Sequence, residues 1–175
     1  MSDVAPQTEL DPRYGSPGAE ATPWPEAVAR LAAAELYWLS TVRPDGRPHV
    51  TPLIGVWQDG AVHFATGAQE RKALNLAGNP QVVLTTGTNT WAEGYDLVVE
   101  GEAVRVTDQA RLHGLAKAWE EKYGTEWHFE VGEDAEFQGT FQGDGGPALV
   151  FAVAPRTAFG FGKGEPFSQT RWRFE

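Results

Sequence analysis

The chain has 175 residues, which matches one compact domain, because a typical domain has roughly 150 residues. Its 24 acidic residues outnumber its 14 basic ones, and the net charge of −10 argues against a protein that binds nucleic acid or an anionic membrane over a broad surface. Cysteine is absent, which excludes disulfides, thiolate catalysis, zinc fingers and iron–sulfur clusters.

Residues 1 to 22 are predicted to form a disordered N-terminal arm, and residues 23 to 175 a single domain. The arm mixes proline, glycine, serine and acidic residues with few large aliphatic side chains, so it buries too little surface to offset the entropy of ordering. It lacks the basic and then apolar pattern of a signal peptide, and no apolar run in the chain approaches the ~18 residues of a membrane-spanning helix. We therefore expect a cytoplasmic protein with no membrane partner.

The domain is predicted to begin with a short helix and three antiparallel strands. Pro23 and Glu26 mark a helix start, and the alanine-rich run EAVARLAAAE continues the helix. The runs LYWLSTVR and HVTPLIGVW flank the turn sequence PDGRP, which predicts a β-hairpin. A second turn, Gln58-Asp59-Gly60, leads into AVHFAT, whose alternation predicts a third strand with one buried face.

A second helix and two strands are predicted to follow. The segment GAQERKALNLAGNP is typical of a helix that ends at Gly78-Asn79-Pro80. Its apolar residues are predicted to share one buried side, namely Ala73, Leu74, Leu76 and Ala77. The runs QVVLTTGT and YDLVVEGEAVRVT have strand patterns, and Gly101 in the second favours a bulge or bend.

The last part of the chain is predicted to contain a helix, a loop and three strands. Asp108 is a candidate cap for the helix QARLHGLAKAWEEKYG, which ends at Gly124. The segment from about Trp127 to Pro147 is rich in glycine and acidic residues, and we expect an insertion loop that either gates a cleft or only decorates the surface. The runs ALVFAVAP, RTAFGFG and SQTRWRF are the predicted closing strands.

These elements together predict a mainly β fold. Many short strands, turn signals and mostly antiparallel connections are typical of a closed or split β-barrel with peripheral helices. A doubly wound α/β fold is disfavoured, because strands and helices do not alternate regularly and the glycine-rich turn between a strand and a helix is missing.

Most familiar catalytic and metal-binding patterns are absent from the sequence. The four histidines do not have the spacing of metal ligands, so no metal site is predicted. The run GFGKG lacks a Ser or Thr after Lys163 and therefore indicates a turn or bulge rather than a phosphate loop. Ser40 lies within a strand pattern, without the sharp turn of a nucleophile elbow. No side chain is therefore predicted as the catalytic acid, base or nucleophile.

The segment from Phe64 to Lys72 has the one pattern that favours a ligand. A strand ends at Thr66, a short turn follows, and Arg71 and Lys72 lie in the first turn of a helix. Free backbone amides and the helix dipole already favour anions there. Two cations oppose the dipole unless an anion lies between them, so the pattern indicates a phosphate site. The alternative is a solvated Arg-Lys pair on a helix face.

Three segments carry a resemblance to a known family. FATGAQERKALNLAGNPQVVL resembles the flavin-phosphate segment of the pyridoxamine-phosphate-oxidase-like split-barrel family, STVRPDGRPHVTPL resembles its preceding hairpin, and AFGFGKGEPFSQTRWRF resembles its closing strands. The three occur in the family's order. The resemblance implies a homodimer of split β-barrels of about six strands, with two flavin-type cofactors between the subunits.

The resemblance also implies roles for residues near the cofactor phosphate. Ala65 and Thr66 match the pair at the strand end that contacts the cofactor, and Arg71 and Lys72 match the pair that binds its phosphate. Phe161 falls where the oxidases have a tryptophan, and Arg171 has the spacing of their C-terminal arginine. We expect the strand-end set and the C-terminal set to come from opposite subunits.

Further residues are implied near the cofactor ring. The backbone of Thr51, Pro52 and Leu53 would contact the ring edge, and Trp172, with Trp57 and Phe161, would wall the cleft. Each of these aromatic residues has an alternative role in the core or in a dimer interface.

The implied cofactor is FMN or the 8-hydroxy-5-deazaflavin coenzyme. The run VTPLIG from Val50 to Gly55 is uncharged where the true oxidases have basic residues, and in this it resembles a branch of the family that often uses the deazaflavin coenzyme. The resulting hypothesis is an oxidoreductase that transfers a hydride to or from a conjugated small-molecule substrate. The alternatives are a carrier of a flavin or tetrapyrrole without turnover, and a structural dimer with an empty cleft.

Overall fold

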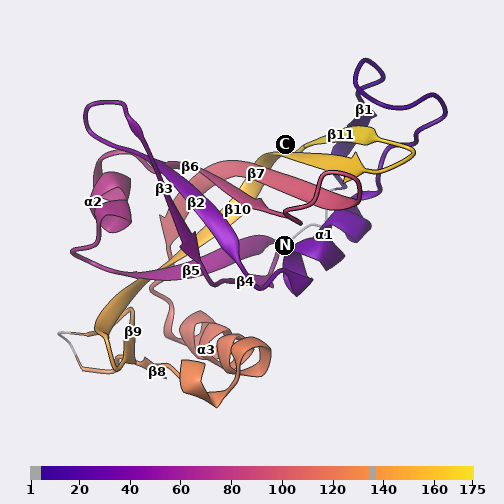
Figure 1. Cartoon of the computed structure of the whole chain (residues 1–175). Helices are drawn as coiled ribbons and strands as arrows, with labels where there is room; N and C mark the ends of the chain where they lie inside the picture. The colour runs from indigo at the N-terminus through magenta and orange to yellow at the C-terminus, as the bar shows by residue number, and fades with distance from the viewer. Residues whose placement is uncertain (1–4, 135–136) are drawn as a thin grey trace.

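The computed structural model describes residues 5–134 and 137–175, and it is dominated by antiparallel β-structure (Figure 1). The strands are β1 (Gln7–Leu10), β2 (Tyr37–Val42), β3 (Pro48–Leu53), β4 (Val56–Gln58), β5 (Ala61–Gly67), β6 (Gln81–Thr86), β7 (Gly94–Arg105), β8 (Glu130–Val131), β9 (Thr140–Gly143), β10 (Gly146–Lys163) and β11 (Ser168–Arg173). The helices are α1 (Trp24–Ala33), α2 (Arg71–Gly78) and α3 (Gln109–Tyr123), with a 3₁₀ turn, η1 (Thr125–Trp127). The main strand order is β1-β11-β10-β7-β6-β2-β3, and this sheet does not close on itself. The predicted β-dominant split barrel is confirmed.

The predicted hairpin and turns form as the sequence indicates. Strands β2 and β3 pair antiparallel from Tyr37 opposite Leu53 to Val42 opposite Pro48. Gly46 has a φ of 84° in the turn between them, and Gly60 has a φ of 76° in the next turn, which is a backbone region that favours glycine. Alternate residues of β2 are buried, so one face of the hairpin packs on the core.

Strand β10 is a single long strand where the sequence predicts two. It pairs with β5 and β9 along its first half and with β11 along its second half, and β7 follows it along most of its length. The register shifts between Pro155 and Thr157, opposite Gly101. The bulge therefore lies on β10, and Gly101 allows the close approach, since a Cβ there would lie 2.5 Å from the Ala154 carbonyl oxygen.

The predicted N-terminal arm contains a strand. Residues 1–4 lie outside the described residues, but β1 pairs with β11 from Gln7 opposite Arg173 to Leu10 opposite Thr170. Glu9 forms ion pairs with Arg171 and Arg173 on the neighbouring strand. The expectation of a mobile arm is therefore corrected for this part: composition predicts too little buried surface, whereas the open edge of β11 supplies backbone hydrogen bonds and charge partners.

Helix α2 has the predicted position but a different buried face. Ala73, Asn75 and Leu76 are buried, whereas Leu74 and Ala77 are exposed, so the prediction for these two residues is wrong. The Asn75 side-chain amide donates a hydrogen bond to the Thr41 hydroxyl at 2.9 Å. This partner on β2 lets a polar residue take an inward position, which the apolar pattern alone does not reveal.

The segment predicted as an insertion loop contains the short strands β8 and β9, and it packs with α3 into a small lobe. Figure 1 shows α3, β8 and β9 together below the barrel. The Asp108 carboxylate caps α3 by accepting a hydrogen bond from the Arg111 amide at 2.8 Å, as predicted. Leu112, Trp119 and Phe141 are buried in this second core, which is continuous with Val56 and Val150 of the barrel strands.

The barrel core is closed at one end by α1 and an aromatic cluster. Trp24 on α1 packs against Trp57, Trp172 and Phe174, with ring centroids 4.8–6.0 Å apart. The Trp172 indole N–H donates to the Thr22 carbonyl at 3.1 Å. No helix within residues 5–134 and 137–175 combines the length and the apolar character that crossing a membrane requires.

Candidate functional site

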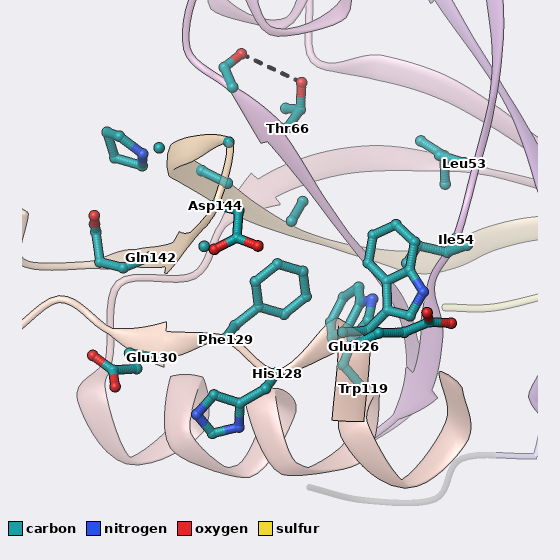
Figure 2. A pocket seen from close by; sticks show the side chains of 18 of the residues that line it. Leu53, Ile54, Thr66, Trp119, Glu126, His128, Phe129, Glu130, Gln142 and Asp144 are labelled. Atoms are coloured by element: carbon teal, nitrogen blue, oxygen red, sulfur yellow. Dashed lines mark hydrogen bonds between the residues drawn. The ribbon is translucent and has the colours of Figure 1, made fainter. Parts of the chain in front are cut away.

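A cavity of about 840 Å³ lies between the barrel and the lobe (Figure 2). This volume is typical of a site for a small molecule or cofactor. The barrel contributes the link between β3 and β4 and the end of β5, and the lobe contributes α3, η1 and the β9–β10 hairpin. The segment predicted as an insertion loop therefore lines this cavity and is not mere decoration.

The barrel side of the cavity contains three of the predicted site residues. Leu53, Ala65 and Thr66 line it, together with Ile54 and Gly67. Thr66 is 2% exposed and its hydroxyl lies 3.4 Å from the Gly67 carbonyl oxygen. The strand end that the sequence singles out thus lies at the wall of this cavity.

The lobe side of the cavity is aromatic. Trp119 is buried and packs edge-on against Phe129 and Phe141, at centroid distances of 6.2 and 5.6 Å. Phe129 and Phe141 stack at 5.0 Å, and Trp127 lies 6.4 Å from Phe129. Figure 2 shows Phe129 in the middle of the cavity wall, across from the end of β5. Trp127 remains 40% exposed.

The cavity lining is acidic. Glu70, Glu126, Glu130 and Asp144 line the cavity, whereas its lining includes no lysine or arginine among the described residues. His128 also lines the cavity, and its Nδ1 lies 2.6 Å from a carboxylate oxygen of Glu120. The Glu120 carboxylate raises the pKa of His128 by hydrogen bonding to it.

A basic cluster lies directly outside the cavity, at the start of α2. Arg71 is exposed, and Lys72 contacts Glu70, with 11% of its side chain exposed. Burial and then the charges of Arg43, Lys72 and Arg71 lower the pKa of His49. Three cations therefore lie close enough to act on one histidine, in a chain whose net charge is −10.

Glu70 connects the acidic cavity with the basic cluster. Its carboxylate accepts a hydrogen bond from the Gly67 amide at 2.8 Å and contacts Lys72. Burial alone would raise the pKa of Glu70, but the hydrogen bonds from Lys72 and Gly67 hold it below the usual value. Glu70 is a site residue that sequence reasoning missed, although its position immediately before the Arg-Lys pair was a signal.

Strand β3 carries Thr51, Pro52 and Leu53, the residues that are predicted to contact the cofactor ring. It ends the strand order of the described sheet, so one side of its backbone pairs with no strand there. Leu53 lines the cavity, Pro52 is exposed, and the Thr51 hydroxyl is buried with no hydrogen-bond partner in the described structure. Thr51 and Pro52 are not among the residues that line the cavity.

Phe161 and Arg171 are not brought to this cavity within one chain. They line a separate pocket of about 490 Å³ between β1, β10 and β11, where Arg171 is paired with Glu9. The prediction that Trp172 walls a cofactor cleft is corrected, because Trp172 is 0% exposed inside the aromatic cluster of the core. Trp57 packs against the barrel core beside it.

Sequence reasoning also missed the aromatic wall. Trp119 is a core residue of α3 that becomes a cavity residue only when the lobe packs on the barrel. The pair Trp127 and Phe129 in an otherwise glycine-rich and acidic segment was an available signal, because large aromatic residues are rare in loops without a packing or binding role.

Comparison with known proteins gives one family match. The family model described as pyridoxamine 5'-phosphate oxidase matches residues 23–157. No curated protein sequence matches the chain.

Several solved structures share the fold. A conserved hypothetical protein from Mycobacterium tuberculosis is 22% identical, with a TM-score of 0.61 over 78% of this chain and 82% of that one. The heme storage protein HutZ from Vibrio cholerae is 21% identical, with a TM-score of 0.60 over 81% and 96% of the two chains. A structure described as an F420 reductase is 22% identical, with a TM-score of 0.52 over 74% and 93%. At these identities the likeness establishes the fold alone.

Proposed function

Because this chain belongs to the pyridoxamine 5'-phosphate oxidase family, we propose that it is an oxidoreductase that binds FMN or the 8-hydroxy-5-deazaflavin coenzyme. The proposed reaction is hydride transfer to or from a conjugated small molecule. One observation carries the proposal: the cavity beside Thr66 adjoins a cluster of cations at the start of α2. A phosphate-bearing cofactor requires this combination of a roomy cleft and a local cationic anchor.

The residues at the phosphate end fit the group. Arg71 is free to reorient because it is exposed, and Lys72 would share its charge between Glu70 and the phosphate. The backbone amides at the start of α2 add donors, and the cationic neighbour Arg43 adds long-range attraction. Thr66 would present its hydroxyl at the strand end.

The residues at the ring end fit a planar cofactor. Within residues 5–134 and 137–175, one edge of β3 pairs with no strand and offers backbone hydrogen-bonding groups, and the Thr51 hydroxyl has no partner. Leu53 and Ala65 supply an apolar surface on which a ring can lie. When bound, a flavin or deazaflavin supplies the hydride chemistry, and the protein binds, orients and shields it from water.

We also propose that two copies of the chain form the complete site. The outer face of the sheet carries a row of apolar side chains that no described element covers: Trp38, Val50, Val83, Val98 and Phe159. Pairing through this face would bury them and bring the pocket of Phe161 and Arg171 to a partner chain. A homodimer would thereby bring the cavity beside Thr66 in one chain close to the pocket of Phe161 and Arg171 in the other.

Titration of the purified chain with FMN and with the deazaflavin coenzyme tests the proposal. We expect one of them to bind at micromolar or lower concentration, and Arg71→Ala with Lys72→Ala to weaken binding by about 30-fold or more, because charge-assisted hydrogen bonds to the phosphate are lost. The matched control is Lys117→Ala, an exposed lysine on α3 that does not line the cavity. Unchanged affinity in the double variant would refute the proposal that Arg71 and Lys72 bind the phosphate.

The second candidate function is a carrier of a flavin or tetrapyrrole without turnover. It is supported by the heme storage protein and a heme binding protein from Mycobacterium smegmatis among the structures of the same fold. Steady-state turnover of the reduced cofactor with an artificial acceptor separates the two candidates. Stoichiometric binding without turnover would favour the carrier.

A further inference from the structure

The cavity and its surroundings have opposite charges at opposite ends. The cations Arg71 and Lys72 lie at the start of α2, outside the lining, whereas Glu126, Glu130 and Asp144 come from the lobe and line the cavity. No ion pair among the described residues involves these three carboxylates. Their charge is therefore available to a molecule that occupies the lobe end.

The same end presents aromatic rings. Trp127 keeps 40% of its surface exposed, and Phe129 beside it faces the cavity in Figure 2, with Asp144 and Glu126 on either side. Ring faces attract flat conjugated molecules by stacking and attract cations through the ring quadrupole. Aromatic faces flanked by unpaired carboxylates therefore favour a ligand that is both planar and positively charged.

We propose that the substrate of this protein is a planar aromatic cation, bound against Trp127 and Phe129 between the carboxylates of Glu126, Glu130 and Asp144. This inference rests on the proposed function, of which it names the substrate class. Arg71 and Lys72 would hold the phosphate of the cofactor at the cationic end, and the carboxylates of the lobe would hold the positively charged substrate at the other end. An aromatic cation is also electron-poor, which is the electronic property that a hydride acceptor needs.

The charge distribution excludes the opposite class from the lobe end. Glu126, Glu130 and Asp144 are exposed at the cavity wall, and three like charges on one side of a cavity repel an anion that enters it. A molecule that carries carboxylates or phosphates of its own meets no lysine or arginine in the described lining to compensate. Anionic conjugated molecules are therefore rejected as substrates, by repulsion as well as by the absence of a partner.

Two dyes of similar shape and opposite charge test the proposal on the chain without cofactor. Methylene blue is a planar tricyclic cation, and resorufin is a planar tricyclic anion slightly above neutral pH. We expect equilibrium dialysis to show methylene blue binding at least about tenfold more tightly than resorufin, and Glu126→Gln, Glu130→Gln and Asp144→Asn together to abolish that preference. Trp127→Ala should weaken methylene blue binding, and Trp127→Phe should preserve it.

The control removes the same amount of charge elsewhere. Because the whole chain is acidic, a cation is attracted to it nonspecifically. The matched triple variant Glu20→Gln, Glu93→Gln and Glu121→Gln alters exposed residues outside the cavity lining and should retain the preference. Equal binding of both dyes, or an equal loss of preference in the two triple variants, would overturn the inference. Cofactor titration is measured separately. If the protein binds no cofactor but still prefers methylene blue, that result counts against the proposed function and not against the cation site.

Discussion

His63 shows how a single position on a barrel strand determines the charge of a side chain. It lies on β5 and is 0% exposed, with its Nε2 atom 3.5 Å from the Arg111 guanidinium. Burial, and secondly the positive charge of Arg111, lower the pKa of His63 to about 4. The imidazole is therefore neutral in the folded chain at physiological pH, and it acts as a core residue of the barrel rather than as a proton donor.

Stability is expected to fall in mild acid because of His63. In the unfolded chain this histidine takes up a proton near pH 6.5, whereas the folded chain takes it up only near pH 4, so unfolding binds a proton between these values. The neutral, buried imidazole therefore contributes to the free energy of unfolding fully above pH 6.5, and this contribution is lost as the pH falls to 4. The total loss is at most about 3 kcal/mol. Denaturant unfolding of the protein at several pH values measures the fall.

The matched comparison uses His63→Gln and His113→Gln, the latter on the exposed surface of α3. The first should flatten the dependence on pH and the second should leave it unchanged. An NMR titration of the unmodified protein provides an independent check, and a His63 imidazole that titrates at the ordinary pH of histidine would contradict the prediction.

At the scale of elements, the end of α3 holds the lobe against the barrel. The Tyr123 hydroxyl accepts a hydrogen bond from the Gly55 amide at 3.0 Å and lies within donating distance of the carbonyl oxygens of Gly55 and Glu35. Lys122 donates to the Gly55 carbonyl at 2.8 Å, and burial lowers the pKa of this lysine to about 8. These contacts position the link between β3 and β4, which carries the cavity residues Leu53 and Ile54.

Tyr123→Phe is expected to lower the free energy of unfolding by about 1–2 kcal/mol, because the buried Gly55 amide then loses its hydrogen-bond partner. It should also weaken binding of the cofactor severalfold, since the cavity wall at Leu53 is less firmly held. Denaturant unfolding and cofactor titration measure the two effects. Tyr14→Phe, at a residue that is 64% exposed, is the control. A variant as stable as the unmodified protein would show that the lobe is held by its apolar contacts alone.

At the scale of the whole molecule, two hydrophobic cores and one open sheet face define the architecture. One core fills the barrel under α1, and the second joins the lobe to the barrel strands. The cavity is lined by residues of both the barrel and the lobe. The outer face of the sheet remains apolar, with Trp38 45% and Val50 52% exposed. An exposed apolar row of this kind is typical of a protein interface.

The chain is expected to be a dimer in solution at micromolar concentration, and Trp38→Glu with Val50→Asp is expected to convert it into a monomer. Charges on that face would oppose the burial of a second copy, whereas a single chain should keep its fold, because Trp38 is 45% and Val50 52% exposed and a charged side chain there can reach water. Light scattering measures the mass against the 19.1 kDa of one chain, and circular dichroism verifies folding. A monomeric unmodified protein would contradict the shared-site proposal.

Much of the local structure follows from the sequence by itself. The turns at Gly46 and Gly60, the Asp108 cap and the alternation of β2 depend on interactions between near neighbours, and they form as predicted. Strand β5 also forms, but the prediction of one buried face is wrong, because Ala61, Val62, His63 and Phe64 are all buried. The strand end at Thr66 next to the cations of α2 is also a local feature, so the sequence is sufficient to locate it.

Which of these local features come together depends on contacts made in the folded chain. Trp172 lies in the core rather than at the site, β1 pairs with the far end of the chain, and Trp119 and Trp127 wall a cavity against β5. Each outcome depends on contacts between residues that are distant in sequence, which hydrophobic periodicity and turn chemistry do not encode. Local sequence patterns are sufficient for the β-rich fold and for the position of Arg71 and Lys72 next to the strand end. The shape and charge of the cavity depend on the packing of the lobe on the barrel, because that contact brings carboxylates and aromatic rings opposite the strand end.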